Sequence, residues 1–146
     1  MAETRKFSRP VQVLERFTPS GGILRQVEVV SSGDKTVTAA MSSRMFVATA
    51  ASGTQTFTLP LAATAAGLHY TFVCGHASGE ILVTPDAADQ ISIKGLVDHS
   101  TSVKPTAGTG VKNSASGNVI GDHLTLVSDG VATWHDVAAG GIWASQ

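Results

Sequence analysis

The chain has 146 residues, of which 42% are hydrophobic, 5% aromatic and 14% charged, with 15 glycines. A chain of this length can bury one sizeable core, and its scarcity of Glu, Lys and Arg favours short strands over long amphipathic helices. The formal net charge of −1 gives no overall field that would attract nucleic acid or an anionic membrane. We therefore expect one β-rich domain.

The first 22 residues predict an extended N-terminal arm. Residues 1–44 carry seven Lys or Arg against four Asp or Glu, whereas residues 45–146 carry three against seven, so the front of the chain is basic. The run Val11-Gln12-Val13-Leu14 alternates weakly, as in an edge strand or a segment that becomes ordered on a partner. The breaker-rich residues 18–22 end the arm. A frayed terminus is the simpler alternative.

The arm has neither the residue order of a signal peptide nor a long apolar run. A signal peptide places a basic region before an apolar one, and a membrane-spanning helix needs about 18 or more apolar residues. We therefore expect synthesis and folding in a cytoplasm.

Short strand signals follow the arm, separated by Gly, Pro, Asp and Ser. The apolar and polar residues partly alternate within them, which is typical of a sheet with one solvated face. Pro60 ends one of these strands, the Ala-rich stretch after it predicts a short helical turn, and Gly67 supplies the left-handed residue that ends the turn. Strands are expected at residues 24–30, 35–40, 44–49, 53–59, 68–73, 80–85 and 90–93.

The last third of the chain divides into a loop and a hairpin. Residues 99–121 are dominated by Ser, Thr, Gly and Asn, and we interpret them as a long exposed loop or an insertion. A loop of this length in so small a domain is uncommon unless it binds something or is disordered. Residues 122–137 alternate around the turn dipeptide Asp129-Gly130, as in a hairpin. Trp134 and Trp143 are large apolar anchors; filling the core is the commoner role, and a subunit interface is the alternative.

Taken together, these patterns predict an all-β fold. We expect a compact antiparallel β-sandwich or barrel-like domain over residues 23–146, preceded by the arm of residues 1–22 and containing at most one short helix.

The residue types that carry enzyme chemistry do not form a familiar pattern. Cys74 is the only cysteine and follows a strand-like run, so we expect a small buried hydrophobe rather than a nucleophile. Neighbouring residues of a strand face opposite sides, so neither Asp122-His123 nor His135-Asp136 can act as a pair on one face. Asp86 and Asp89 are too few for a calcium loop. We expect no enzyme, no cofactor and no metal, although distant histidines could still assemble a zinc site.

Nucleic-acid binding would need a basic stripe interleaved with aromatic residues. Docking on an acidic protein surface explains the basic residues equally well, so we expect neither nucleic acid nor membrane as a partner. The basic residues near the N-terminus are Arg5, Lys6, Arg9, Arg16 and Arg25, with only Phe7 and Phe17 among them.

Three segments together resemble a module of tailed-bacteriophage virion proteins. They are Thr56–Pro60, a strand ending in Leu-Pro; Ala66–Phe72, an aromatic strand after an Ala/Gly-rich turn; and Leu124–Gly130, a hairpin strand with a Ser-Asp-Gly turn that is followed by Trp134. The resemblance covers roughly residues 53–143 and is moderately specific as a set.

The resemblance implies a capsid decoration (cement) protein, often a homotrimer, that sits on the outer capsid surface of the virion and bridges major capsid subunits. Because the chain is short and has an arm that can add a strand to another surface, we favour this reading over a tail-fibre or receptor-binding module, for which residues 99–121 would be the recognition loop. A carbohydrate-binding β-domain is the third alternative. The arm residues expected to contact the capsid are Arg5, Lys6, Phe7, Arg9, Val11, Val13 and Leu14.

Overall fold

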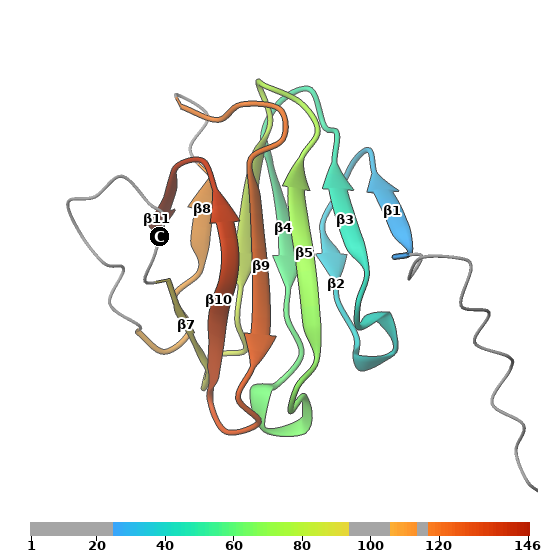
Figure 1. Ribbon diagram of the computed structural model, residues 1–146. Helices are drawn as coiled ribbons and strands as arrows, with labels where there is room; N and C mark the ends of the chain where they lie inside the picture. Colours follow the sequence, from blue (N-terminus) through green and yellow to red (C-terminus); the bar gives the residue numbers. More distant parts are fainter. Residues whose placement is uncertain (1–24, 94–105, 114–116) are drawn as a thin grey trace, which may run out of the picture.

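The computed structural model describes residues 25–93, 106–113 and 117–146, and the predicted arm of residues 1–22 lies outside them. The predicted all-β fold is confirmed: two β-sheets lie one behind the other, with the six-stranded sheet in front (Figure 1). The described residues contain no α-helix and two single-turn 3-10 helices, Ala39–Met41 and Ala62–Thr64, where we expected at most one short helix.

The larger sheet has six strands, among them the two strands of the predicted hairpin, β9 and β10. Its strands in spatial order are β1 (Val27–Val30), β3 (Met45–Ala48), β5 (His69–Cys74), β9 (His123–Ser128), β10 (Thr133–Gly140) and β7 (Gln90–Ser92).

The smaller sheet has five strands and covers the inner side of the larger one (Figure 1). Its strands in spatial order are β11 (Trp143–Ser145), β8 (Val111–Asn113), β6 (Glu80–Thr84), β4 (Thr54–Thr58) and β2 (Lys35–Thr36).

The first six strands alternate between the two sheets. Because the chain crosses to the other sheet after each strand and then returns, β1, β3 and β5 run parallel, as do β2, β4 and β6. Among the described strands five pairings are parallel and four antiparallel, so the expected antiparallel arrangement holds only in part. The side-chain period of two is the same in both arrangements, which is why the sequence could not separate them.

An aromatic cluster joins the two sheets. Phe57 of β4 lies with its ring centroid 5.2 Å from that of Phe72 and 5.7 Å from that of Phe46, which belong to β5 and β3. Tyr70 connects this group to Trp134 at 5.6 Å and donates its hydroxyl to the Thr38 carbonyl. All five rings are fully buried, so each adds apolar burial as well as tilted or stacked ring contacts.

The turn residues behave as predicted. The Ala-rich stretch forms the 3-10 turn Ala62–Thr64, and Gly67 after it has a φ of +73°. Gly130 in the predicted hairpin turn has a φ of +76°, a left-handed conformation that glycine adopts without strain. The 3-10 turn Ala39–Met41 takes the place of the predicted end of a strand.

Residues 99–121 are not one exposed loop. Their described part contains β8, in which Val111 and Asn113 are buried, and Asn118 beyond it is also buried. The strand β8 was not predicted because it has three residues and only one of them is apolar.

Both tryptophans fill the core. Trp134 and Trp143 are fully buried, which is the commoner of the two roles considered, and neither offers surface to a second subunit. Trp143 donates its indole N–H to the Gly140 carbonyl at 3.1 Å, whereas Trp134 Nε1 has no hydrogen-bond partner among the described residues.

Candidate protein-binding face

The outer side of the six-stranded sheet is lined mostly by uncharged side chains. In β3, Phe46 and Ala48 point into the core, so by the period of two Met45 and Val47 point outward. We call this surface the valine-rich face. Its central residues, two on each of β1, β3, β5 and β9, are Val27, Val29, Met45, Val47, Thr71, Val73, His123 and Thr125.

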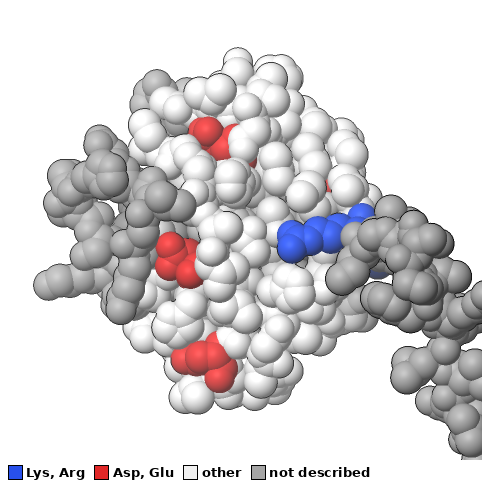
Figure 2. Space-filling view, viewed as in Figure 1, with Lys and Arg blue, Asp and Glu red and all other residues white. Residues whose placement is uncertain are grey.

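The strand register places these residues in rows. Neither row contains Asp, Glu, Lys or Arg, and Figure 2 shows this side of the molecule with its few visible charged side chains widely separated. Residues that face one another across strands contact directly and make a continuous surface. The two rows are Val27, Met45, Thr71 and Thr125, and Val29, Val47, Val73 and His123.

Two threonines at the centre of this face form a hydrogen bond with each other. The Thr71 and Thr125 hydroxyls lie 2.9 Å apart, and both residues are less than a tenth exposed. Arg25 donates from Nη1 to Thr71 Oγ1 at 3.4 Å. The polar atoms in the middle of the face therefore already have partners, and Arg25 holds the start of the described chain against it.

The outer side of the five-stranded sheet has a different chemistry. Thr36, Thr58 and Thr84 lie opposite one another across three strands, with 3.3 Å between the hydroxyls of the last two. Lys112 forms an ion pair with Glu80 at 2.7 Å on the same side. This surface, the threonine face, is polar and charged, as expected of a sheet surface that stays solvated.

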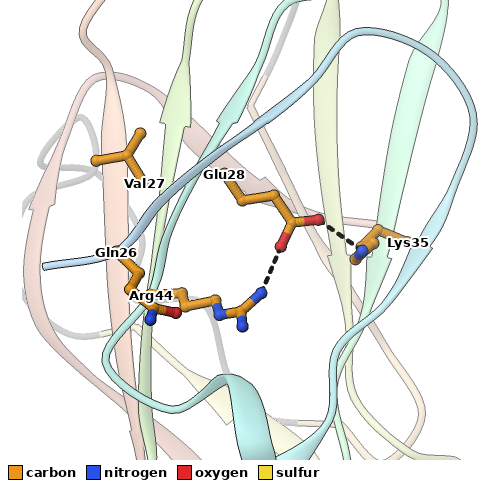
Figure 3. Close-up of a pocket in the computed structure, with 5 residues that line it drawn as sticks. All are labelled: Gln26, Val27, Glu28, Lys35 and Arg44. Carbon is orange, nitrogen blue, oxygen red and sulfur yellow. Dashed lines mark hydrogen bonds and ion pairs between the residues drawn. The ribbon is translucent and has the colours of Figure 1, made fainter.

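An ionic cluster closes the end of the sandwich between β1 and β2. Glu28 of β1 and Lys35 of β2 both point between the sheets, with 2.6 Å between Oε1 and Nζ, and Arg44 reaches the other Glu28 oxygen at 3.0 Å (Figure 3). Together with Gln26 and Val27 they line a shallow open pocket. The hydrogen bonds from Lys35 and Arg44 lower the pKa of the Glu28 carboxyl, with that from Lys35 the larger cause.

Strand β1 is the open edge of the six-stranded sheet. The Gln26 and Val30 carbonyl oxygens accept hydrogen bonds from the β3 side, so the main chain of Val27 and Val29 between them points away from the sheet. Their side chains are 59% and 63% exposed. Strand edges of this kind pair readily with another chain.

Cys74 and Asp129 have structural roles. Cys74 is buried and donates to the His76 carbonyl at 3.2 Å, and burial is the main cause that raises the pKa of its thiol. Asp129 accepts backbone N–H groups from three residues of its own turn, and these bonds lower the pKa of its carboxyl. His135 lies 3.7 Å from Asp129, a contact that neighbouring positions in the sequence did not reveal.

Metal and membrane features can be stated for the described ranges only. Within them no three His, Cys, Asp or Glu side chains lie together so that they could hold a metal ion. The same ranges contain no helix with the length and apolarity needed to cross a membrane.

The residues predicted from the sequence to form the binding site are not those that make up the valine-rich face. The seven arm residues proposed for capsid contact lie outside the described residues, and both tryptophans are in the core. The valine-rich face was missed because we expected outward positions to be polar, yet β3 is apolar on both sides in its sequence Met45-Phe46-Val47-Ala48. That run without alternation was the available signal.

A search against known protein families found no match for this chain, and a search of curated proteins found no similar sequence.

Proposed function

We propose that this chain is a capsid decoration protein of a tailed bacteriophage, which binds the outer capsid surface and stabilises the shell by bridging major capsid subunits. One observation supports it most. Arg25, the first residue that the structure describes, donates a hydrogen bond to Thr71 of the valine-rich face, so the described chain begins at this largely apolar surface. A largely apolar surface at the start of the described chain, preceded in the sequence by basic residues, suits a protein that docks on another.

The arm supplies the charge and the body supplies the apolar surface. Arg5, Lys6 and Arg9 would meet carboxylates of the shell, while Phe7, Val11, Val13 and Leu14 would add apolar contact or strand pairing. A ligand that binds only the assembled shell stabilises it by mass action, and contacts repeated in a homotrimer increase the effective affinity.

We also propose that the chain is not an enzyme. The support comes from the roles of its reactive groups. The Cys74 thiol is buried with a raised pKa, which makes it a poor nucleophile, and the Asp129 carboxylate next to His135 is committed to holding a turn. Neither group is available to a substrate in this arrangement.

The alternative of a tail-fibre or receptor-binding module loses part of its support. It relied on an exposed recognition loop at residues 99–121, and β8 within that segment is instead paired with β6 and β11. Val111 and Asn113 of this strand are buried.

Copy number in purified particles tests the proposal directly. Quantitative mass spectrometry should find hundreds of copies in a simple ratio to the major capsid protein, whereas a handful would assign the protein to the tail and none would refute both. Replacing Arg5, Lys6 and Arg9 with alanine in the full-length chain should weaken binding to shells that lack the protein. Unchanged circular dichroism would show that the variant is folded, and unchanged binding would argue against the arm.

A further inference from the structure

We infer that the valine-rich face is the side of this protein that lies against the shell, and that its partner surface is aliphatic with a carboxylate opposite Arg25. This inference rests on the proposed function and adds to it the orientation of the body and the chemistry of the surface that receives it.

The two sheet surfaces differ in what they would lose on contact with another protein. Burying Glu80 and Lys112 of the threonine face would desolvate an ion pair, which costs free energy unless new partners replace water. The valine-rich face has no such charge in its two rows, and its central Thr71 and Thr125 hydroxyls are already paired. Removing this face from water is therefore favourable without a matching polar surface on the partner.

Exposure of the apolar side chains is greatest at the open edge. Val27 and Val29 are 59% and 63% exposed, and they continue the rows that Met45 and Val47 carry into the sheet. Contiguous apolar surface of this kind marks interaction sites more often than isolated exposed residues do.

The size of the face indicates which partner it fits. Four strands about 4.8 Å apart and about five residues long give the face a geometric footprint of roughly 300 Å². A stable pair of proteins buries about 800 Å² of accessible surface on each partner. A second copy bound through this face alone would therefore dissociate readily. A shell subunit can be reached by the arm as well, since 24 extended residues span up to about 80 Å.

Charge indicates the chemistry of the receiving surface. Arg25 is a charged side chain that contacts the valine-rich face, and residues 1–22 before it include four further Lys or Arg residues. A surface with aliphatic side chains at its centre and carboxylates beside them would complement both features.

The test measures binding of the full-length protein to shells assembled without it. Val47→Asp places a carboxylate in the centre of the valine-rich face, and Val29→Asp places one at its exposed edge, where folding is least affected. Thr56→Asp is the matched control, since it adds the same charge to the middle of β4 on the threonine face. Circular dichroism and urea midpoints establish that each variant is folded.

We expect both valine variants to bind at least about tenfold more weakly and Thr56→Asp to bind within about twofold of the unmodified protein. Three outcomes would overturn the inference while leaving the decoration role intact. They are undiminished binding by all three variants, a similar loss in all three, and a loss confined to Thr56→Asp. Failure of the unmodified protein to bind shells would overturn the proposed function itself.

Discussion

Phe57 is the aromatic side chain through which the smaller sheet contacts the aromatic residues of the larger one. Its ring is fully buried and lies 5.7 Å from Phe46 and 5.2 Å from Phe72. Replacing it with leucine keeps an apolar side chain but removes both ring contacts. Two such contacts contribute about 1–3 kcal/mol, and the incompletely filled space adds about 1 kcal/mol. We therefore expect Phe57→Leu to lower the free energy of unfolding by about 2–4 kcal/mol.

Urea unfolding followed by tryptophan fluorescence measures this loss. Trp134 and Trp143 are fully buried, so their emission reports exposure of the core. Val131→Ala is a suitable control because Val131 is 72% exposed, and its effect should stay within about 0.5 kcal/mol. The slope of free energy against urea should not change, since the same surface is exposed on unfolding.

A double-mutant cycle isolates the contact between the sheets. Phe46→Leu combined with Phe57→Leu should show a coupling energy of about 0.5–1.5 kcal/mol, because these two rings contact each other directly. A loss below about 1 kcal/mol for Phe57→Leu, or strict additivity in the cycle, would refute the view that this cluster holds the two sheets together.

Three further predictions concern the ionic cluster, the thiol and the turns. Glu28→Gln should lower stability at pH 7 by less than about 1 kcal/mol; because the folded-state pKa of Glu28 is lowered, this contribution is present above its unfolded pKa and disappears as pH falls through the folded value. Cys74 should react with a thiol reagent at least about 100-fold more slowly in the folded than in the urea-unfolded protein. Gly67→Ala should cost about 1–2 kcal/mol, since a Cβ there meets nothing within 4 Å, whereas Gly130→Ala should cost more because its Cβ would lie 2.6 Å from that of Ala66.

Each of these has a contrary outcome. A stability difference for Glu28→Gln that persists at pH 2 would show that the ion pairs are not its cause. Equal labelling rates in the folded and unfolded protein would contradict burial of the thiol. Equal losses for the two glycine variants, measured by urea midpoints, would show that contact with Ala66 adds nothing to the backbone strain.

Local features of this chain were predictable because they depend on neighbouring residues. Pro60 and Gly67 bracket the 3-10 turn as expected, and the Asp129-Gly130 dipeptide lies at the hairpin turn between β9 and β10. A φ near +75° suits glycine wherever it occurs in the fold, so such turns can be assigned without knowing what surrounds them.

The tertiary structure decided how the strands pair and which surface is apolar. Alternation in β4 or β6 shows which side chains share a face, but the same pattern fits a parallel or an antiparallel neighbour, and the crossing of the chain between sheets settles the choice. The Glu28–Lys35 ion pair joins residues of different sheets, so their closeness in space follows from that crossing.

The sequence by itself therefore determined an all-β chain with its turns and a basic N-terminal segment, because these follow from residue type and local spacing. Only the tertiary structure brought Val29, Val47 and Val73 into one row across three strands. A surface of this kind is made from residues that are far apart in the sequence, and its composition depends on the register between strands, which no single strand specifies.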